Sequence, residues 1–232
     1  MKKYHVVIPA AGKGTRMGRE YNKLLIKMGG QTILERTIEV FENDASCEGI
    51  HLAIHPRDRA QFSSLLRPYH KLKSLIDGGA ERQESIHNVL NALTLTDDTI
   101  VIVHDGARPF ITQDAIHQLL LAIDRHGAAI IGVKSKDTIK VVQDQYVSET
   151  LDRQYLWLVY TPQGATFKNL KAAYDYAKNQ KFQGTDDASL LEFAGHRVFV
   201  VEGRYDNIKV TTEEDLLYAQ AILNEKGDVG HV

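Results

Sequence analysis

The chain of 232 residues contains a single cysteine, Cys47, which excludes an internal disulfide and any zinc site built from several cysteines. It has no apolar run long enough for a secretory signal or a membrane span, so we expect a cytoplasmic protein. Basic and acidic residues nearly balance, at 28 and 30, which excludes a generally basic nucleic-acid binder. Any cationic site must therefore be local and its ligand small.

No stretch rich in Pro, Gly or Ser resembles an interdomain linker, which predicts one domain over residues 1–232. Short apolar runs alternate with amphipathic segments, a pattern typical of a mostly parallel sheet with helices on both faces. We expect strands at 4–9, 49–55, 73–77, 99–104, 128–133, 156–161 and 197–202, and helices at 32–41, 57–66, 81–93, 112–124, 167–179, 186–193 and 213–224. The fold class is α/β and Rossmann-like.

Residues 138–151 break this rhythm, because two β-branched runs flank Gln143-Asp144-Gln145 without an amphipathic helix. The pattern predicts a β-hairpin, part of an arm over residues 135–156. A lone hairpin is marginal in water, so it should pack against another surface. That surface is either a second subunit or the main sheet, with the hairpin as an antiparallel edge; the sequence leaves both open.

The most informative segment, residues 6–24, joins an apolar strand to a glycine-rich turn and two spaced cations, and reads VVIPAAGKGTRMGREYNKL. Four small residues in the turn would let backbone N–H groups approach phosphate oxygens: Ala10, Ala11, Gly12 and Gly14. The cations Arg16 and Lys23 could neutralise charge on a phosphorus centre under attack. The segment therefore predicts a nucleoside triphosphate site.

Two better-known glycine loops do not match this segment. The P-loop needs Ser or Thr after its lysine, but Lys13 precedes Gly14 and no upstream glycine is present. The dinucleotide motif needs a third glycine where Met17 stands, and the second predicted strand ends in His55-Pro56 rather than in an acid. A dinucleotide-binding oxidoreductase and a tight turn without any ligand remain as alternatives.

Further polar clusters follow predicted strands, at the rim where open α/β sheets bind ligands. Residues 77–85, DGGAERQES, form either a turn whose backbone contacts a base or an ordinary turn before a helix with an acidic first turn. Asp105 and Arg108 in HDGARP follow a very apolar run. Asp105 could hold magnesium, or it could form a purely structural pair with Arg108.

The later clusters DTIK, LDR and TPQ carry hydroxyls and a guanidinium that suit a phosphomonoester. GTDDAS has the pattern of a helix cap with an acidic first turn. Lys209 in DNIKVTT is either a solvated loop charge or a cation that steers an acceptor phosphate. His51 and His55 have no third metal ligand at a useful spacing, so we assign the histidines to packing or exposed positions.

In this order and at these intervals, VVIPAAGKGTRMG, HDGARP, DTIK, TPQ, GTDDAS and DNIKVTT closely resemble the 2-C-methyl-D-erythritol 4-phosphate cytidylyltransferase family of the non-mevalonate isoprenoid pathway. The resemblance spans nearly the whole chain. It implies a homodimer in which the arm of one subunit interlocks with that of the other. PAAG and GTDDAS favour this family over the ribitol 5-phosphate cytidylyltransferases, the nearest alternative.

The resemblance also implies a role for individual residues. The catalytic set is Arg16, Lys23, Arg153 and Lys209, of which Arg16 and Lys23 would stabilise the transition state. The nucleotide would be bound by Ala10, Ala11, Gly12, Gly14, Gly79, Ala80, Arg82, Ser85 and Asp105. The acceptor would be bound by Arg108, Thr138, Arg153, Thr161, Thr185 and Lys209. Mg²⁺ or another divalent cation is the implied cofactor, with Asp105 as its candidate ligand.

The chain departs from the family pattern at several positions. Asn22-Lys23-Leu24 stands where Pro-Lys-Gln is frequent, which keeps the cation and removes the rigid proline before it. Ala80 replaces a frequent Asp, so only a backbone contact to the base carries over. Tyr160 and Ala165 replace a frequent Gln and an aromatic residue, which can change the shape of the acceptor pocket.

The expected reaction is in-line attack of an acceptor phosphate oxygen on the α-phosphorus of CTP. It releases pyrophosphate and leaves 4-diphosphocytidyl-2-C-methyl-D-erythritol. Because two anions must meet, the protein's task is charge neutralisation and alignment, and no general base is required. A non-catalytic nucleotide-binding module is the distant alternative.

Overall fold

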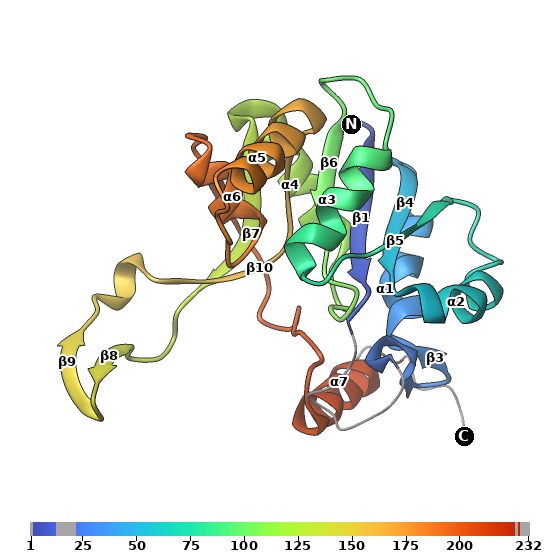
Figure 1. Ribbon diagram of the computed structural model, residues 1–232. Coiled ribbons are helices and arrows are strands. Elements are labelled where there is room, and N and C mark those ends of the chain that lie inside the picture. Colours follow the sequence, from blue (N-terminus) through green and yellow to red (C-terminus); the bar gives the residue numbers. More distant parts are fainter. Residues whose placement is uncertain (1, 13–21, 226, 228–232) are drawn as a thin grey trace.

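A seven-stranded sheet forms the centre of the computed structural model, which describes residues 2–12, 22–225 and 227 (Figure 1). The strand order is β11-β7-β10-β6-β1-β4-β5. The bounds are β1 Tyr4–Ala10, β4 Cys47–Ile54, β5 Leu72–Asp77, β6 Ile100–Val103, β7 Ala128–Lys134, β10 Trp157–Thr166 and β11 Phe199–Glu202. Only β10 runs antiparallel to its neighbours. The prediction of a mostly parallel α/β sheet is therefore confirmed.

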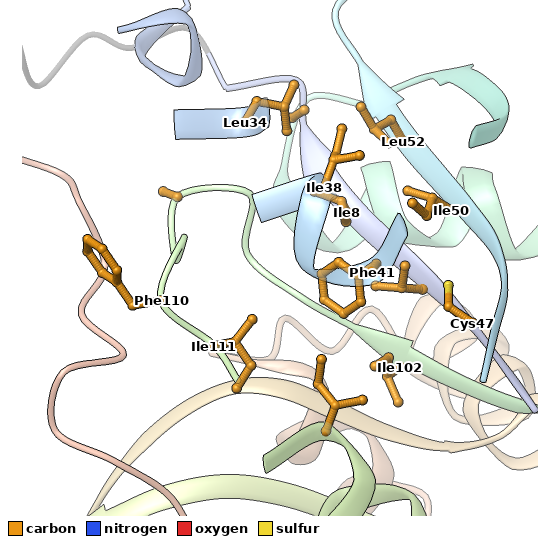
Figure 2. Packing of buried hydrophobic residues seen from close by; sticks show 14 of the residues in the cluster. Ile8, Leu34, Ile38, Phe41, Cys47, Ile50, Leu52, Ile102, Phe110 and Ile111 are labelled. Carbon is orange, nitrogen blue, oxygen red and sulfur yellow. The ribbon is translucent and has the colours of Figure 1, made fainter. Parts of the chain in front are cut away.

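Helices cover both faces of the sheet: α1 Ile33–Glu42, α2 Arg59–Leu65, α3 Arg82–Ala92, α4 Gln113–His126, α5 Phe167–Asn179, α6 Asp187–Phe193 and α7 Glu213–Glu225. Neighbouring strand residues pack on opposite faces, as the two-residue strand period requires. Ile8 of β1 packs in a cluster with Phe41 and Ile102 (Figure 2), whereas Val7 packs on the other face against residues of α3, α5 and α6. In the described part of the chain, no helix is long and apolar enough to span a membrane.

Side chains fix the ends of these helices. The hydroxyl of Thr32 accepts the Glu35 N–H, and the Glu35 carboxylate accepts the Thr32 N–H, which forms a capping box at α1. The Thr112 hydroxyl accepts the Ala115 N–H at the start of α4, and Gly127 ends that helix with φ of 85°. These local signals explain why the helix boundaries follow the sequence closely.

One strand differs from its prediction. The sequence places Thr161-Pro162-Gln163 at the end of a strand, but β10 continues to Thr166 and runs antiparallel. The ladder tolerates Pro162, which has no N–H, because the pairing register shifts between Tyr160 and Gln163. A Cβ at Gly164 would lie 2.5 Å from the Val101 carbonyl, so glycine lets the strand continue there. Thr161 consequently lies inside the sheet and not on a strand-to-helix loop.

The predicted hairpin is present as β8 Lys140–Gln143 and β9 Tyr146–Thr150, a separate two-stranded sheet that projects from the body (Figure 1). Asp144 and Gln145 form its tip with φ of 49° and 69°, as a two-residue hairpin turn with both central residues at positive φ requires. The alternative of an edge strand on the main sheet is wrong.

Short elements complete the structure. β2 Lys27–Met28 and β3 Gln31–Thr32 form a small antiparallel ribbon that the sequence did not predict. Strand β2 of this ribbon contacts α7, so the segment that follows β1 lies beside the last helix of the chain (Figure 1). Single 3₁₀ turns occur at η2 Lys23–Leu25, η3 Pro56–Asp58 and η4 Arg153–Tyr155. The first of these turns carries Lys23 toward the carboxyl end of β1.

Candidate active site

A cavity of about 230 Å³ lies at the carboxyl ends of β1, β5 and β6. It brings together these residues predicted for the site: Ala10, Ala11, Gly12, Lys23, Gly79, Ala80, Arg82, Ser85, Asp105 and Lys209. Gly14 and Arg16 lie outside the described residues. The cavity occupies the rim position that parallel α/β sheets use for ligands.

The loop after β5 is held in shape by its own side chains. The Ser85 hydroxyl accepts the Gly79 N–H at 3.0 Å and donates to the Glu81 carbonyl at 2.9 Å. The Ala80 N–H donates to the Glu84 carboxylate at 2.8 Å. A Cβ at Gly78 would lie 2.5 Å from the Ala11 Cβ, so this glycine lets the loop approach the end of β1. One ordered backbone segment thus forms a cavity wall.

The turn after β6 is anchored by a buried hydrogen-bond chain. His104 Nε2 lies 3.0 Å from the Arg108 carbonyl, which can only accept, so Nε2 carries the proton. Burial lowers the pKa of His104 to about 4, so the ring is neutral and its Nδ1 accepts from the Thr161 hydroxyl at 3.2 Å. The Thr161 oxygen in turn accepts the Asp105 N–H at 3.0 Å. Thr161, predicted to bind the acceptor, is buried here and orients Asp105.

Asp105 is the carboxylate around which the cations gather. Its oxygens lie 2.8 Å from Lys209 Nζ, 3.3 Å from Arg82 Nε and 3.6 Å from Arg108 Nε. Burial opposes its ionisation, but Arg82, Lys209 and Arg108 outweigh that effect and hold the pKa of Asp105 well below its ordinary value. The group is therefore an anion that fixes three cations at the cavity.

Arg82 also donates to the Asp187 carboxylate, from Nη1 at 3.1 Å and from Nη2 at 2.7 Å. The Asp187 carboxylate is fully buried and also accepts from the Tyr174 hydroxyl. Burial disfavours the charged guanidinium, but Asp187 and then Asp105 outweigh it and raise the pKa of Arg82. GTDDAS forms the predicted helix cap with an acidic first turn, in which Asp187 lies, but the pattern did not indicate the contact of Asp187 with Arg82. Asp186 alone caps α6, through the Ser189 N–H.

Lys23 and Lys209 reach the cavity from opposite ends of the chain. Lys23 Nζ donates to the Val210 carbonyl at 3.4 Å, and the Val210 N–H donates to the Ala107 carbonyl at 2.8 Å. These bonds connect the segment after β1, the turn after β6 and the C-terminal segment. Two ammonium groups are thereby placed beside one backbone wall, an arrangement suited to a polyanionic ligand.

The residues predicted to bind the acceptor fall into two groups. Arg108 is buried near the cavity, where Nη1 donates to the Asn207 carbonyl at 2.9 Å and the guanidinium lies 4.6 Å from the Tyr160 ring centroid. Thr138, Arg153 and Thr185 are exposed and do not line the cavity. Arg153 lies at the base of the arm and donates to the Lys136 carbonyl at 2.7 Å.

The described residues do not provide enough side-chain ligands to bind a metal ion by themselves. None of their His, Cys, Asp and Glu side chains form a group of three that could hold a metal ion. Asp105 contributes one carboxylate, and cations already contact both of its oxygens. His51 contacts His5 and Ser74, at 3.0 and 2.8 Å, in a packed position. A magnesium ion at this cavity would have to take most of its ligands from phosphate oxygens and water.

Comparison with known proteins gives a consistent result. A family model described as IspD, 2-C-methyl-D-erythritol 4-phosphate cytidylyltransferase, matches residues 4–225. The enzyme of that name from Lysinibacillus sphaericus is 47% identical over 225 residues, which cover 96% of each chain. The one from Geobacillus thermodenitrificans is 46% identical over 222 residues, or 95% of this chain and 96% of the relative.

Solved structures resemble the fold over the same length. The 4-diphosphocytidyl-2C-methyl-D-erythritol synthase of Anaerococcus prevotii superposes with a TM-score of 0.86 at 32% identity and covers 96% of both chains. The 2-C-methyl-D-erythritol 4-phosphate cytidylyltransferase of Francisella tularensis gives a TM-score of 0.82 at 34% identity, covering 95% of this chain and 99% of that one.

Proposed function

Because the chain belongs to the 2-C-methyl-D-erythritol 4-phosphate cytidylyltransferase family, we propose that it transfers the cytidylyl group of CTP to 2-C-methyl-D-erythritol 4-phosphate. The products are pyrophosphate and 4-diphosphocytidyl-2-C-methyl-D-erythritol. The observation that carries this function is the cavity where Lys23, Arg82 and Lys209 converge beside the loop after β5. The names of the full-length relatives favour the methylerythritol acceptor over ribitol 5-phosphate.

The chemistry follows from the charges that must meet. The acceptor phosphate has its second pKa near 6 and is largely ionised at neutral pH, so it can attack the α-phosphorus without a general base. Lys23 and Lys209 offset the negative charge that builds up as the two anions approach. Arg16 would add to this charge, a role that rests on the family resemblance alone. His104 is neutral and fully hydrogen-bonded, and it serves as a positioning residue.

The nucleotide would bind along the backbone wall of the cavity. The segment Ala10–Ala11–Gly12 lies where N–H groups at the end of β1 would meet the triphosphate, with Gly14 further along the loop. Gly79, Ala80 and Ser85 belong to the loop that would contact the cytosine, and Arg82 begins the helix that follows it. Positioning of both substrates in this geometry supplies a large part of the rate gain.

A homodimer would account for the two predicted acceptor residues that lie at the arm and do not line the cavity. Thr138 and Arg153 lie at the arm, apart from Lys23 and Asp105, and would complete the site of a second subunit. Val142, Tyr146 and Val147 of the hairpin are 55%, 80% and 59% exposed, an apolar surface that pairing of two arms would cover. Thr185 and Arg108 would serve the acceptor within their own chain. The location we propose is the cytoplasm.

Magnesium is part of this proposal as a partner of the triphosphate. Asp105 would hold the ion together with phosphate oxygens, with one of its present cation contacts given up. When bound, the ion would neutralise part of the triphosphate charge.

A two-acceptor assay tests the proposed function. Purified protein is incubated with CTP, a divalent cation and either 2-C-methyl-D-erythritol 4-phosphate or ribitol 5-phosphate, and pyrophosphate release is measured. We expect release with the methylerythritol acceptor and little with ribitol 5-phosphate. The reverse preference would support the ribitol alternative. If the protein bound CTP but released no pyrophosphate with either acceptor, the result would support the alternative of a non-catalytic nucleotide-binding module.

A further inference from the structure

Asn22 ties together three segments at the edge of the cavity, immediately before Lys23. Its side-chain Nδ2 donates to the Ala10 carbonyl at 2.7 Å and to the Asp58 carboxylate at 3.1 Å, and its Oδ1 accepts the Leu24 N–H at 3.1 Å. Ala10 ends β1, Asp58 belongs to η3 after β4, and Leu24 lies in η2. We call these three hydrogen bonds the Asn22 clamp.

The clamp is buried and its donors are fully used. Asn22 is 2% exposed and Asp58 is 7% exposed. An amide nitrogen has two protons to donate, and here they go to two different acceptors. The side chain of Asn22 therefore has no N–H left for a substrate, although the residue lines the cavity. A side chain without a free N–H cannot donate to a phosphate, so we assign Asn22 a role through what it holds in place.

What the clamp holds is the backbone that carries Lys23. Asn22 has φ of −64° and ψ of 122° and serves as the N-cap of η2, where the Leu24 N–H is bound by its side chain. Lys23 then reaches the cavity and donates to the Val210 carbonyl. The φ value is the one that a proline ring would impose covalently. The hydrogen bonds thus hold noncovalently a backbone angle that a ring could also fix.

We propose that Asn22, with Asp58 as its buried anchor, is a positioning residue for cytidylyl transfer that fixes the Lys23 ammonium at the nucleotide cavity. This inference rests on the proposed function, because Lys23 matters only if charge develops there. Ala10 is both a clamp acceptor and a predicted contact of the triphosphate. The clamp therefore fixes the ammonium and the triphosphate backbone relative to each other.

The main test compares kcat and both KM values of the wild type, Asn22→Ala, Lys23→Ala and the double variant carrying both changes. We expect Asn22→Ala to lower kcat by about tenfold or more, since small misplacements of catalytic groups cost this much. In the Lys23→Ala background the same change should lower kcat by less than about twofold, because there is no ammonium left to misplace. An equal loss of kcat in both backgrounds would overturn the proposal.

Two further substitutions separate the clamp from a general effect on folding. Asn22→Pro keeps φ near −64° without the side-chain bonds, so it should retain a higher kcat than Asn22→Ala. Asn22→Asp places a carboxylate against the Ala10 carbonyl and the Asp58 carboxylate, so it should be slower than Asn22→Ala. The proposal fails if Asn22→Pro is no faster than Asn22→Ala, or if Asn22→Asp matches the wild type.

The control is Gln113→Ala, which removes another side-chain amide that donates to a backbone carbonyl, that of Val40 at 3.4 Å, away from the cavity. Its kcat should equal that of the wild type. Each variant is checked by circular dichroism and thermal melting, so that kcat refers to folded protein. A wild type that transfers no cytidylyl group would refute the proposed function, whereas an active wild type with a fully active Asn22→Ala would refute the clamp alone.

Discussion

The guanidinium of Arg82 and the carboxylate of Asp187 form two parallel contacts, of 3.1 and 2.7 Å, between residues 105 positions apart in the sequence. Such a bidentate, charge-assisted ion pair fixes the orientation of the guanidinium as well as its distance from the carboxylate. Because Asp187 is fully buried and Asp105 contacts the other side of Arg82, the guanidinium is held between two carboxylates. The pair links helix α6 to the cavity at the carboxyl ends of β1, β5 and β6.

Asp187→Asn should weaken nucleotide binding as well as stability. The amide keeps one acceptor for Arg82 and removes the negative charge, so the guanidinium loses part of its anchor. We expect KM for CTP to rise on the order of tenfold and the free energy of unfolding to fall by about 1–3 kcal/mol. Steady-state kinetics and urea unfolding measure both. Glu192→Gln, an exposed acid on the same helix, is the control; a normal KM for CTP in Asp187→Asn would contradict the anchoring role.

Lys23→Ala and Lys209→Ala should each lower kcat by on the order of a hundredfold, the usual effect of deleting one preorganised charged or hydrogen-bonding group at a reacting centre. The same loss is expected for Arg16→Ala on the strength of the family resemblance. Pyrophosphate release under saturating substrates measures kcat. Lys27→Ala removes an exposed lysine close in sequence and should leave kcat unchanged. Turnover near the wild-type value in Lys23→Ala would show that the cavity is not where charge develops.

Acid should destabilise the protein through its buried histidines. Burial, with His5 and Lys73 nearby, lowers the pKa of His51 to about 4. Because the unfolded chain takes up a proton near pH 6.5 and the folded chain only near 4, stability falls as the pH drops through this window. The cost for His51 alone is about 2 kcal/mol at pH 4.5, which urea unfolding at pH 7 and 4.5 would detect. His51→Gln should show a smaller pH dependence; an equal one would exclude this cause.

The arm should control both association and acceptor use. Tyr146→Glu puts a charge on an apolar, 80% exposed position of the hairpin and should convert a dimer into monomers in sedimentation experiments. Monomers should also lose acceptor turnover, because Thr138 and Arg153 would no longer complete a partner's site. Leu217→Glu, at a 74% exposed apolar position on α7, is the matched control and should remain dimeric. A Tyr146→Glu monomer with normal turnover would contradict the shared site.

Arg153→Ala separates association from chemistry. The side chain lies at the base of the arm and its removal should leave the dimer intact, while KM for the methylerythritol acceptor rises and KM for CTP changes little. Unchanged kinetics with both substrates would remove Arg153 from the acceptor site.

Patterns within the sequence predicted most of the fold. Strand β1 and helices α1 and α4 follow from apolar periodicity and from caps such as Thr112, which act over a few residues. The end of strand β10 was predicted too early. The strand continues beyond Pro162 because the pairing register shifts there and because Gly164 packs against Val101. Short-range signals cannot indicate either contact.

For the candidate site too, the sequence predicted what short-range patterns and sheet topology determine and did not predict what long-range contacts determine. The loops after β1, β5 and β6 were predicted to meet because parallel strands place their carboxyl ends at one edge. His104, Asp187 and Asn22 were missed as site residues, because their roles depend on contacts with Thr161, Arg82 and Asp58 elsewhere in the chain. The sequence could have indicated Asp187 only as a second acid beside a residue that already caps the helix.

A crystal structure with CTP and a divalent cation tests the central claim most directly. The account predicts that the triphosphate lies against the backbone of residues 10–12 with Lys23 in hydrogen-bond reach, and that the cytosine lies beside the loop of residues 79–85. A nucleotide bound elsewhere, with Lys23 and Lys209 away from its phosphates, would contradict it.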